Sequence, residues 1–180
     1  MKDFIFITGN QHKLKWLEKF IGYRVESADI DLDEIQSLDQ EKIVKDKAVR
    51  AYQFANKAVL IEDVSLKFNA LSGLPGPFIK WFLKSLGEEG TYKILSSFED
   101  KTATAEVVYC LYDGDQFRMF QGVTAGKIVN PVGNFGHGWD PLFMPEGSDK
   151  SFGEMNEVEY SKYSPRNKAV AKLKEFLEGN

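Results

Sequence analysis

The sequence predicts an α/β fold built around a mixed sheet. Through the first half of the 180-residue chain, segments with helical spacing of apolar residues alternate with short apolar runs. After residue 101, strand-like segments follow one another directly, and Asp113-Gly114 between two of them is typical of a hairpin turn. No repeat, low-complexity tract or linker divides the chain. We therefore predict a single domain over residues 1–180.

The first half supplies most of the expected helices. Leu14, Leu17 and Phe20 share one face of a helix, and residues 44, 48, 51 and 55 repeat that spacing in a second helix. Pro77 is placed where it would open a third helix. In chain order we expect a strand at 4–8, a helix at 11–20, an acidic loop at 28–38, a helix at 41–57, a strand from Val59, a turn at 73–77, and helices at 79–86 and 87–98.

The second half is dominated by strands. We expect them at 102–113, 116–121, 124–129 and 142–144, with a glycine-rich loop at 133–141 before the last of these. Ser164-Pro165 then begins the final helix, with Ser as the cap and Pro at the first helical position.

Composition excludes several classes of protein. A net charge of −4 argues against binding a nucleic-acid polymer, which requires a basic excess. The single cysteine, Cys110, lies in an apolar run and is expected to be buried rather than disulfide-bonded. The N-terminal apolar run is too short for a signal peptide, and no stretch is long enough to cross a membrane. These features predict a soluble, cytoplasmic protein with no membrane partner.

An acidic pair interrupts the most apolar strand of the chain. The run 59–61 ends abruptly at Glu62 and Asp63, and a turn rich in glycine and proline follows a few residues later. A buried strand that delivers two carboxylates to its end is typical of α/β enzymes. Because removing a carboxylate from water is unfavourable, such a placement indicates a cation or a reaction.

The acidic residues are candidate ligands for a hard divalent cation. Glu34, Glu62 and Asp63 would jointly hold Mg²⁺, which takes one or two protein carboxylates and completes its shell with water and phosphate oxygens. Asp63 would also orient or deprotonate an attacking water. For Glu34 the alternative is a solvated acidic loop with no ligand.

Two further segments are candidates for binding a nucleotide. Thr8, Asn10 and Lys13 lie where a strand passes into a helix, and free N–H groups there would cradle a phosphate. The alternative is an ordinary strand–helix turn, since the Walker pattern is missing. In the loop at 135–141, aromatic residues and Asp140 would stack on a flat base and accept its hydrogen bonds. Alternatively, those aromatics fill the core.

Together the motifs resemble the inosine triphosphate pyrophosphatase family nearly from end to end. The resemblance rests on ITGNQHKL, DLDEIQ, LIEDVSLKFNALSGLPGPFIKWF, GWDPLF and SPR. It implies hydrolysis of non-canonical purine nucleoside triphosphates (those of inosine, deoxyinosine or xanthosine) to the monophosphate and pyrophosphate, with Mg²⁺. It also implies an elongated mixed sheet flanked by helices in two lobes, with the site in a central cleft, and a homodimer.

The resemblance assigns a role to each candidate residue. Thr8, Asn10, Lys13 and Lys47 would hold the triphosphate, and Lys80 would add positive charge nearby. Asp63 would activate water, and with Glu34 and Glu62 it would bind Mg²⁺. His137, Trp139 and Asp140 would lie against the purine, while Ser164 and Arg166 would close on its six-position oxygen.

Three departures from the family pattern lie at the base end of the site. His137 replaces the usual phenylalanine, Pro165 replaces the histidine of Ser-His-Arg, and Tyr160 replaces a lysine for which Lys162 is out of register. Proline has no N–H and no side-chain donor, so one base contact is lost. We therefore expect retained chemistry with altered base selection. The alternatives are an idle nucleotide-binding homologue and a phosphohydrolase of other nucleoside triphosphates.

Overall fold

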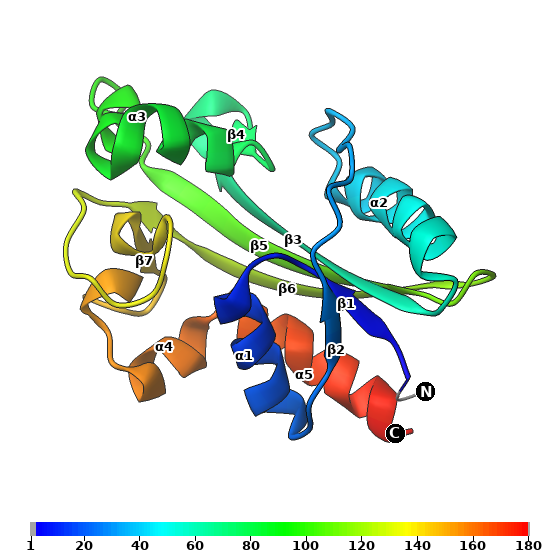
Figure 1. The fold of residues 1–180 in the computed structure, drawn as a ribbon. Coiled ribbons are helices and arrows are strands. Elements are labelled where there is room, and N and C mark those ends of the chain that lie inside the picture. Colours follow the sequence, from blue (N-terminus) through cyan, green and yellow to red (C-terminus); the bar gives the residue numbers. More distant parts are fainter. Residues whose placement is uncertain (1–2, 180) are drawn as a thin grey trace. The chain divides into compact units, whose positions relative to one another are not determined.

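The computed structural model describes residues 3–179, which form a mixed α/β fold (Figure 1). Its elements are β1 (Ile5–Ile7), α1 (Gln11–Ile21), β2 (Glu26–Ala28), α2 (Gln40–Ala55), β3 (Val59–Phe68), η1 (Asn69–Leu71), β4 (Pro75–Gly76), α3 (Ile79–Ile94), β5 (Thr102–Tyr112), β6 (Phe117–Ile128), η2 (Asp140–Leu142), β7 (Phe143–Pro145), η3 (Phe152–Glu154), α4 (Glu157–Tyr163) and α5 (Pro165–Glu178). The predicted fold class is confirmed.

Within residues 3–179 the sheet has seven strands in the order β2-β1-β3-β5-β6-β7, and β4 pairs with β3. β1 is parallel to both β2 and β3, whereas β4 and β7 run antiparallel to their partners β3 and β6. The parallel pairs lie among the elements that alternate with helices, as the sequence pattern implies.

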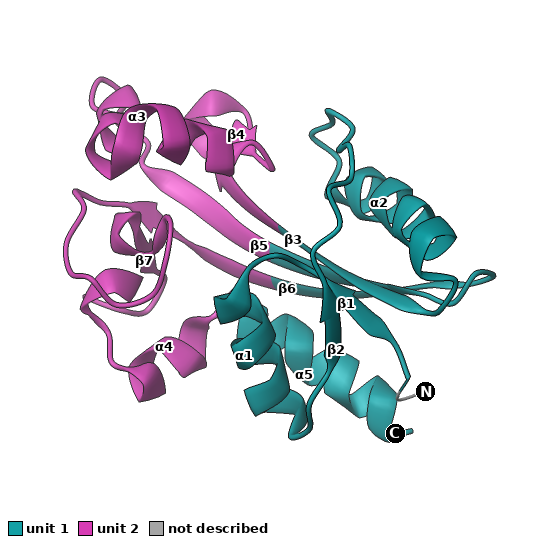
Figure 2. Ribbon diagram, viewed as in Figure 1, with its two compact units in different colours: residues 1–63, 107–122, 166–180 teal, residues 64–106, 123–165 magenta. Residues whose placement is uncertain are grey.

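The chain divides into two compact units, each built from several segments (Figure 2). Unit 1 contains residues 1–63, 107–122 and 166–180, and unit 2 contains residues 64–106 and 123–165. The chain passes between them within β3, β5 and β6, and again after Pro165. The prediction that residues 1–180 form a single domain is not tested by this division and stays a prediction.

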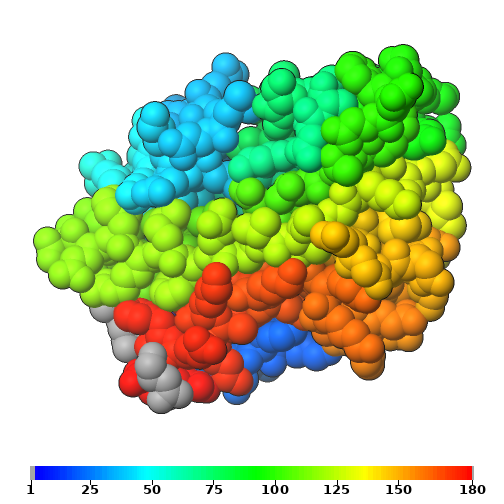
Figure 3. All heavy atoms as spheres, turned by 180° about the vertical axis from the view of Figure 1, so that it is seen from behind, coloured from blue at the N-terminus to red at the C-terminus, as the bar shows by residue number. Residues whose placement is uncertain are grey.

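Unit 1 places helices on both faces of its strands. Val44, Ala48 and Ala51 of α2 share a buried cluster with alternate residues of β1, β3 and β5, including Ile61 and Cys110. On the other face, the Trp16 Nε1–H of α1 donates to Asn167 Oδ1 of α5 at 2.9 Å. The rings of Phe120 and Phe176 pack there with centroids 5.5 Å apart. Figure 3 shows this side, with α5 beside the unit 1 part of β6.

The ends of the unit 1 helices follow from local chemistry. Asn10 caps α1 by accepting hydrogen bonds from the backbone N–H groups of His12 and Lys13, and Asp39 caps α2 in the same way. Gly22 ends α1 with φ +85°, a left-handed conformation that glycine adopts without strain. These caps explain why α2 begins at Gln40, one residue before the predicted start.

Unit 2 is organised around aromatic side chains. Phe152 packs against Tyr160, with centroids 4.7 Å apart, and against Phe143 at 5.5 Å. Trp139 meets the ring of Phe143 at 5.6 Å. All four rings are buried, so they form the core of the region that the glycine-rich loop borders.

Several predicted boundaries are wrong. β3 does not end at the acidic pair but continues to Phe68, because Leu66 and Phe68 are buried and Leu66 pairs with Gly76 of β4. The expected strands at 116–121 and 124–129 are one strand, β6. The sequence also missed β2 and α4, which are short.

The helical region after Pro77 also differs from expectation. Its helix starts at Ile79, two residues beyond Pro77, with Phe78 at the cap. The two predicted helices form α3, which is kinked at Gly87, where φ is +68° and ψ is −176°. The second segment ends at Ile94, short of the predicted 98.

The final helix begins at Pro165, as predicted, and Cys110 is buried. No helix within residues 3–179 has the length and apolar character that spanning a membrane requires.

Replacing Gly133 with alanine should strongly destabilise the protein. Gly133 has φ +85°, a left-handed conformation that is strained for alanine, and the new Cβ would lie 2.0 Å from the Gly153 carbonyl oxygen. The backbone strain and the steric overlap both destabilise the folded state. We expect a loss of about 3 kcal/mol in the free energy of unfolding, measured by urea denaturation. Gly73→Ala is the matched control, because Gly73 has φ +94° but nothing within 4 Å of its Cβ position. Its loss should be about 1 kcal/mol, and equal losses would contradict the overlap.

Candidate functional site

The two acids of the pair point to opposite faces of the sheet. Side chains alternate along a strand, and Ile61 faces α2 within the buried cluster. Asp63 therefore lies on the α2 face, where Gln40 Nε2 of α2 donates to Asp63 Oδ2 at 2.8 Å. Glu62 lies on the opposite face, towards α1 and α5. One dipeptide thus supplies a carboxylate to each side of β3.

Glu62 is buried among three donors. Lys13 Nζ of α1 lies 3.1 Å from Glu62 Oε1, and Arg166 Nη2 of α5 lies 3.3 Å from the same oxygen. The Tyr109 hydroxyl of β5 donates to Oε2 at 2.6 Å. Burial alone would raise the pKa of Glu62, but the charges of Arg166 and Lys13 and the Tyr109 hydrogen bond lower it from 4.5 to about 2. Glu62 therefore stays ionised at neutral pH.

Asp63 has the opposite electrostatic balance. Burial raises the pKa of Asp63 from 3.8 to about 6, and the negative charge of Glu34 adds to the effect. The Gln40 hydrogen bond and the charges of Lys13 and Lys47 only partly oppose it. Glu34 in turn forms an ion pair with Lys47, with 2.8 Å between Lys47 Nζ and Glu34 Oε2. Asp63, Glu34 and Lys47 therefore interact within unit 1.

The donors beside Asp63 suit a hard cation. Within residues 3–179, no three Asp, Glu, His or Cys side chains form a ready-made metal cluster, so the three predicted ligands are not assembled as a cage. Asp63 and Glu34 nevertheless offer the one or two carboxylates that Mg²⁺ uses. Gln40 Oε1, a buried oxygen without a hydrogen-bond partner in the structure, adds an acceptor on the same side chain that holds Asp63.

The turn before α1 holds the other predicted phosphate contacts. The backbone N–H of Asn10 donates to the Thr8 hydroxyl at 3.1 Å, and the Asn10 side chain caps the helix. Lys13 Nζ is committed to Glu62 but keeps 24% of its side chain exposed. An ordinary capped turn accounts for the contacts of Thr8 and Asn10, and their binding roles stay predictions.

The residues predicted to meet the base lie mainly in unit 2. The His137 backbone N–H donates to Asp140 Oδ2 at 2.6 Å, which fixes the buried Asp140 carboxylate to its own loop. Trp139 is only 8% exposed and belongs to the aromatic core. Ser164 is buried at the end of α4, where its N–H donates to the Tyr160 carbonyl. Whether any of them contacts a base stays a prediction.

The remaining residues of interest divide between the units. Arg166 belongs to unit 1, where its Nη2 lies 3.3 Å from Glu62 Oε1. Tyr160 is 4% exposed within the unit 2 core, so that position presents no charge to a ligand. Lys80 lies exposed on α3 in unit 2, with its ammonium 5.7 Å from the Trp81 ring centroid.

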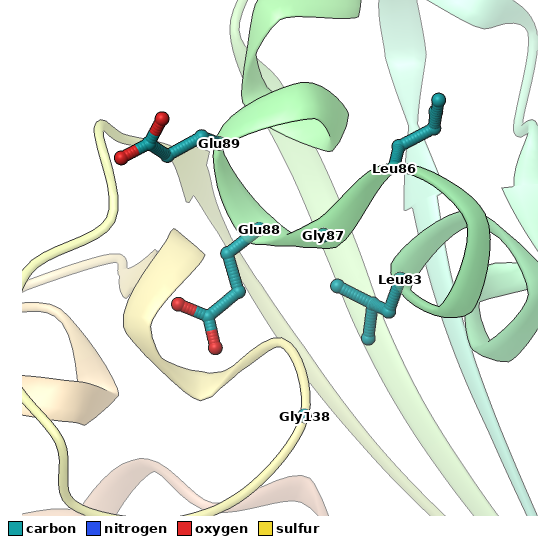
Figure 4. Close-up of a pocket in the computed structure, with 6 residues that line it drawn as sticks. All are labelled: Leu83, Leu86, Gly87, Glu88, Glu89 and Gly138. Atoms are coloured by element: carbon teal, nitrogen blue, oxygen red, sulfur yellow. The ribbon is translucent and has the colours of Figure 1, made fainter.

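A separate hollow of about 520 Å³ lies in unit 2 at the kink of α3. It is lined by Leu83, Leu86, Gly87, Glu88, Glu89 and Gly138 (Figure 4). None of the predicted site residues lines it. Its lining combines apolar side chains with two carboxylates and no cation, which does not suit a triphosphate.

Two residues of the site were not predicted from the sequence. Tyr109 lies in an ordinary apolar strand, and Gln40 looks like a surface residue at the start of a helix. Their contacts depend on partners 47 and 23 residues away. A local sequence pattern cannot predict contacts between residues so far apart in the chain.

Comparisons with known proteins agree on one family. The sequence pattern of the Ham1 family matches residues 4–176. The inosine triphosphate pyrophosphatase of Schizosaccharomyces pombe is 37% identical over 99% of this chain and 96% of its own length, and that of Neurospora crassa is 45% identical over 96% and 91%. Among solved structures, the Staphylococcus aureus Ham1 protein has a TM-score of 0.81 at 27% identity, covering 98% of this chain and 99% of its own. A Coxiella burnetii HAM1 protein, 21% identical, shares the fold with a TM-score of 0.89 over the whole of both chains.

Replacing Asp63 with asparagine should stabilise the protein above pH 6. Because the folded pKa of Asp63 lies above its unfolded value, the stability present at low pH is lost as the pH rises from about 4 to about 6. Asparagine does not ionise and still accepts from Gln40. In chelator, urea denaturation at pH 8 should show a gain of about 2 kcal/mol, which disappears near pH 4. A difference independent of pH would contradict this account.

Proposed function

Because this chain belongs to the Ham1 family, we propose that it hydrolyses non-canonical purine nucleoside triphosphates to the monophosphate and pyrophosphate. The names of its relatives support this activity, since two of them at 37% and 45% identity are inosine triphosphate pyrophosphatases. The observation that carries the proposal is the division of charge at β3. Cations gather on one face at Glu62, and carboxylates gather on the other at Asp63.

Asp63 is the residue that would accept the proton in this reaction. A water oxygen bonds to the α-phosphorus, the bond to the α–β bridging oxygen breaks, and pyrophosphate leaves with the electron pair. The water proton passes to Asp63, whose raised pKa makes it a stronger base than an exposed aspartate. Gln40 holds the carboxylate in one orientation through its 2.8 Å hydrogen bond. The lysines Lys13 and Lys47 provide positive charge for the phosphates.

The proposed reaction uses a divalent cation. The oxygen donors near Asp63 suit Mg²⁺. Asp63 and Glu34 would hold it, with Gln40 Oε1 as a neighbouring acceptor. When bound, the ion would neutralise phosphate charge as a Lewis acid. Lys47 already pairs with Glu34, so it stays close to that charge and would contact the same phosphates. Glu62 was predicted as a third ligand, and that assignment is untested.

The base-end assignments remain part of the proposal. His137, Trp139, Asp140 and Ser164 would recognise the purine, and Lys80 would add positive charge nearby, on the strength of the family motifs alone. Pro165 at the first position of α5 and buried Tyr160 remove two donors from the family pattern. We therefore propose weakened selection between bases. A homodimer and a cytoplasmic location rest on the resemblance and on sequence composition.

Asp63→Asn should abolish turnover while nucleotide binding is largely retained. With inosine triphosphate and Mg²⁺, we expect the rate of pyrophosphate release to fall by about 10² to 10⁴-fold, because the proton acceptor is lost. Asp46→Asn is the matched control, since Asp46 forms an ion pair with Arg50 of the same helix and is not one of the proposed site residues. Preserved turnover would remove Asp63 from the mechanism.

The products of the native chain separate the alternatives. Pyrophosphate indicates the family reaction, orthophosphate indicates another phosphohydrolase, and neither product indicates an idle nucleotide-binding homologue.

Pro165→His should sharpen the preference for inosine triphosphate. Histidine restores a donor at the first position of α5, where the native proline has none. Measured across a panel of nucleoside triphosphates, the ratio of kcat/KM for inosine over guanosine triphosphate should rise by about tenfold. Pro165→Ala restores the backbone N–H alone, so the comparison separates the effect of that donor from the effect of the imidazole. If the native chain already discriminates as strongly as Pro165→His, the altered-selectivity proposal fails.

A further inference from the structure

The side-chain amide of Gln40 depends on Asp63 for its hydrogen bonding. Gln40 is the first residue of α2, directly after the cap Asp39, and is 6% exposed. Its Nε2 donates to Asp63 Oδ2 at 2.8 Å, and its Oε1 has no hydrogen-bond partner among residues 3–179. If Nε2 lost its contact with Asp63, the whole buried amide would be unpaired, which is strongly unfavourable. The fold therefore holds this hydrogen bond in place.

The two carboxylate oxygens of Asp63 are consequently not equivalent. Oδ2 accepts from Gln40, whereas Oδ1 accepts no hydrogen bond from the part of the chain that the structure describes. The Asp63 side chain is partly exposed, so an ion can approach it. Such an ion would find Oδ1 free and Oδ2 already engaged by the amide.

Glu34, the other carboxylate of the proposed cation site, is arranged in the same way. Lys47 Nζ lies 2.8 Å from Glu34 Oε2, and Oε1 has no hydrogen bond from any residue between 3 and 179. Glu34 is 44% exposed, so its oxygens exchange partners more easily than those of Asp63. The two carboxylates thus offer one free oxygen each, and the arrangement at Asp63 is the fixed one.

Divalent cations differ in how they use a carboxylate. Mg²⁺ requires octahedral geometry, takes single oxygens from one or two carboxylates and keeps several of its waters. Ca²⁺ takes roughly six to eight oxygens and often binds both oxygens of one carboxylate. A cation that needs both oxygens of Asp63 must displace Gln40 or share Oδ2 with it. A cation that needs only Oδ1 leaves the buried amide paired.

We propose that Gln40 is a positioning residue that sets the metal specificity of the site. By holding Asp63 Oδ2 it leaves Oδ1 for the cation, and this shifts the preference of the site from Ca²⁺ towards Mg²⁺. The inference rests on the proposed function, because it concerns the cation that the proposed reaction uses. Gln40 acts through Asp63 and is not itself a ligand.

The test compares Gln40→Met with Gln53→Met, a matched control on the same helix. Methionine is similar in length to glutamine but has no N–H, and Gln53 is exposed near the other end of α2. Mg²⁺ or Ca²⁺ is added without nucleotide, and the gain in the free energy of unfolding with metal concentration gives the Kd of each ion. For Gln40→Met, the Ca²⁺ Kd divided by the Mg²⁺ Kd should fall by about tenfold, because both Asp63 oxygens become available. Gln53→Met should keep the native ratio.

A second comparison shows whether Gln40 acts through Asp63. In an Asp63→Asn background, residue 63 has a single side-chain oxygen, so adding Gln40→Met should leave the ratio unchanged. An equal change in both backgrounds would overturn the proposal. So would an unchanged ratio in Gln40→Met alone, or a native chain that neither ion stabilises. If Gln40→Met does not fold, Gln40→Ala takes its place, because it removes the amide without adding bulk.

The same measurements separate this inference from the proposed function. If the native chain releases no pyrophosphate from any nucleotide, the proposed function fails. The metal affinities still decide the role of Gln40, because they require neither nucleotide nor turnover. If pyrophosphate is released and the ratio does not respond to Gln40→Met, only the metal-specificity role is lost.

Discussion

The buried charge of Glu62 is the constraint on which unit 1 depends. An ionised carboxylate removed from water destabilises a fold by several kcal/mol unless partners surround it. Here the partners come from the helices α1 and α5 and from β5, the neighbouring strand in the sheet, so all three elements must meet at Glu62 for the charge to be tolerated. The charges of Arg166 and Lys13 and the Tyr109 hydrogen bond outweigh burial and lower the pKa of Glu62. A packing requirement of the fold thereby fixes two cations near the surface.

The alternation of side chains along β3 gives the two acids different chemistry. Because Glu62 and Asp63 point to opposite faces, they have different hydrogen-bond partners. The charge of Lys13 acts on both acids, but it offsets burial only at Glu62, together with Arg166 and Tyr109. One face carries Lys13 and Arg166 beside Glu62, and the other carries Glu34 and Lys47 near Asp63. Continuation of β3 beyond the pair matters for this separation, since a strand held on both sides keeps both side chains in register. A strand that ended at the acidic pair, as the sequence suggested, would not hold both side chains in this way.

How far the sequence could predict the structure depended on the range of each interaction. Local patterns gave α1, α2, the Asp113-Gly114 turn and the start of α5, because caps, helical spacing and turn residues act within a few positions. The end of β3 was misjudged because charges normally terminate a buried strand, and the residues that neutralise Glu62 lie far away in sequence. Arg166, for example, is 104 residues from Glu62. Family motifs identified candidate residues but not their partners, so Tyr109 and Gln40 were missed.

The contrast between the two acids also distinguishes their roles. The fold surrounds the buried carboxylate of Glu62 with enough charges and donors to offset its burial. The partners of Asp63 offset its burial only in part, and this difference needs its own explanation. Asp63 has a raised pKa, an acidic neighbour in Glu34, and an amide partner, Gln40, whose Oε1 has no hydrogen-bond partner among residues 3–179. Each of these would be relieved by a cation or by a polarised water, and none by further packing. The partners of Glu62 all lie within the protein, whereas the cation that we propose would complete those of Asp63.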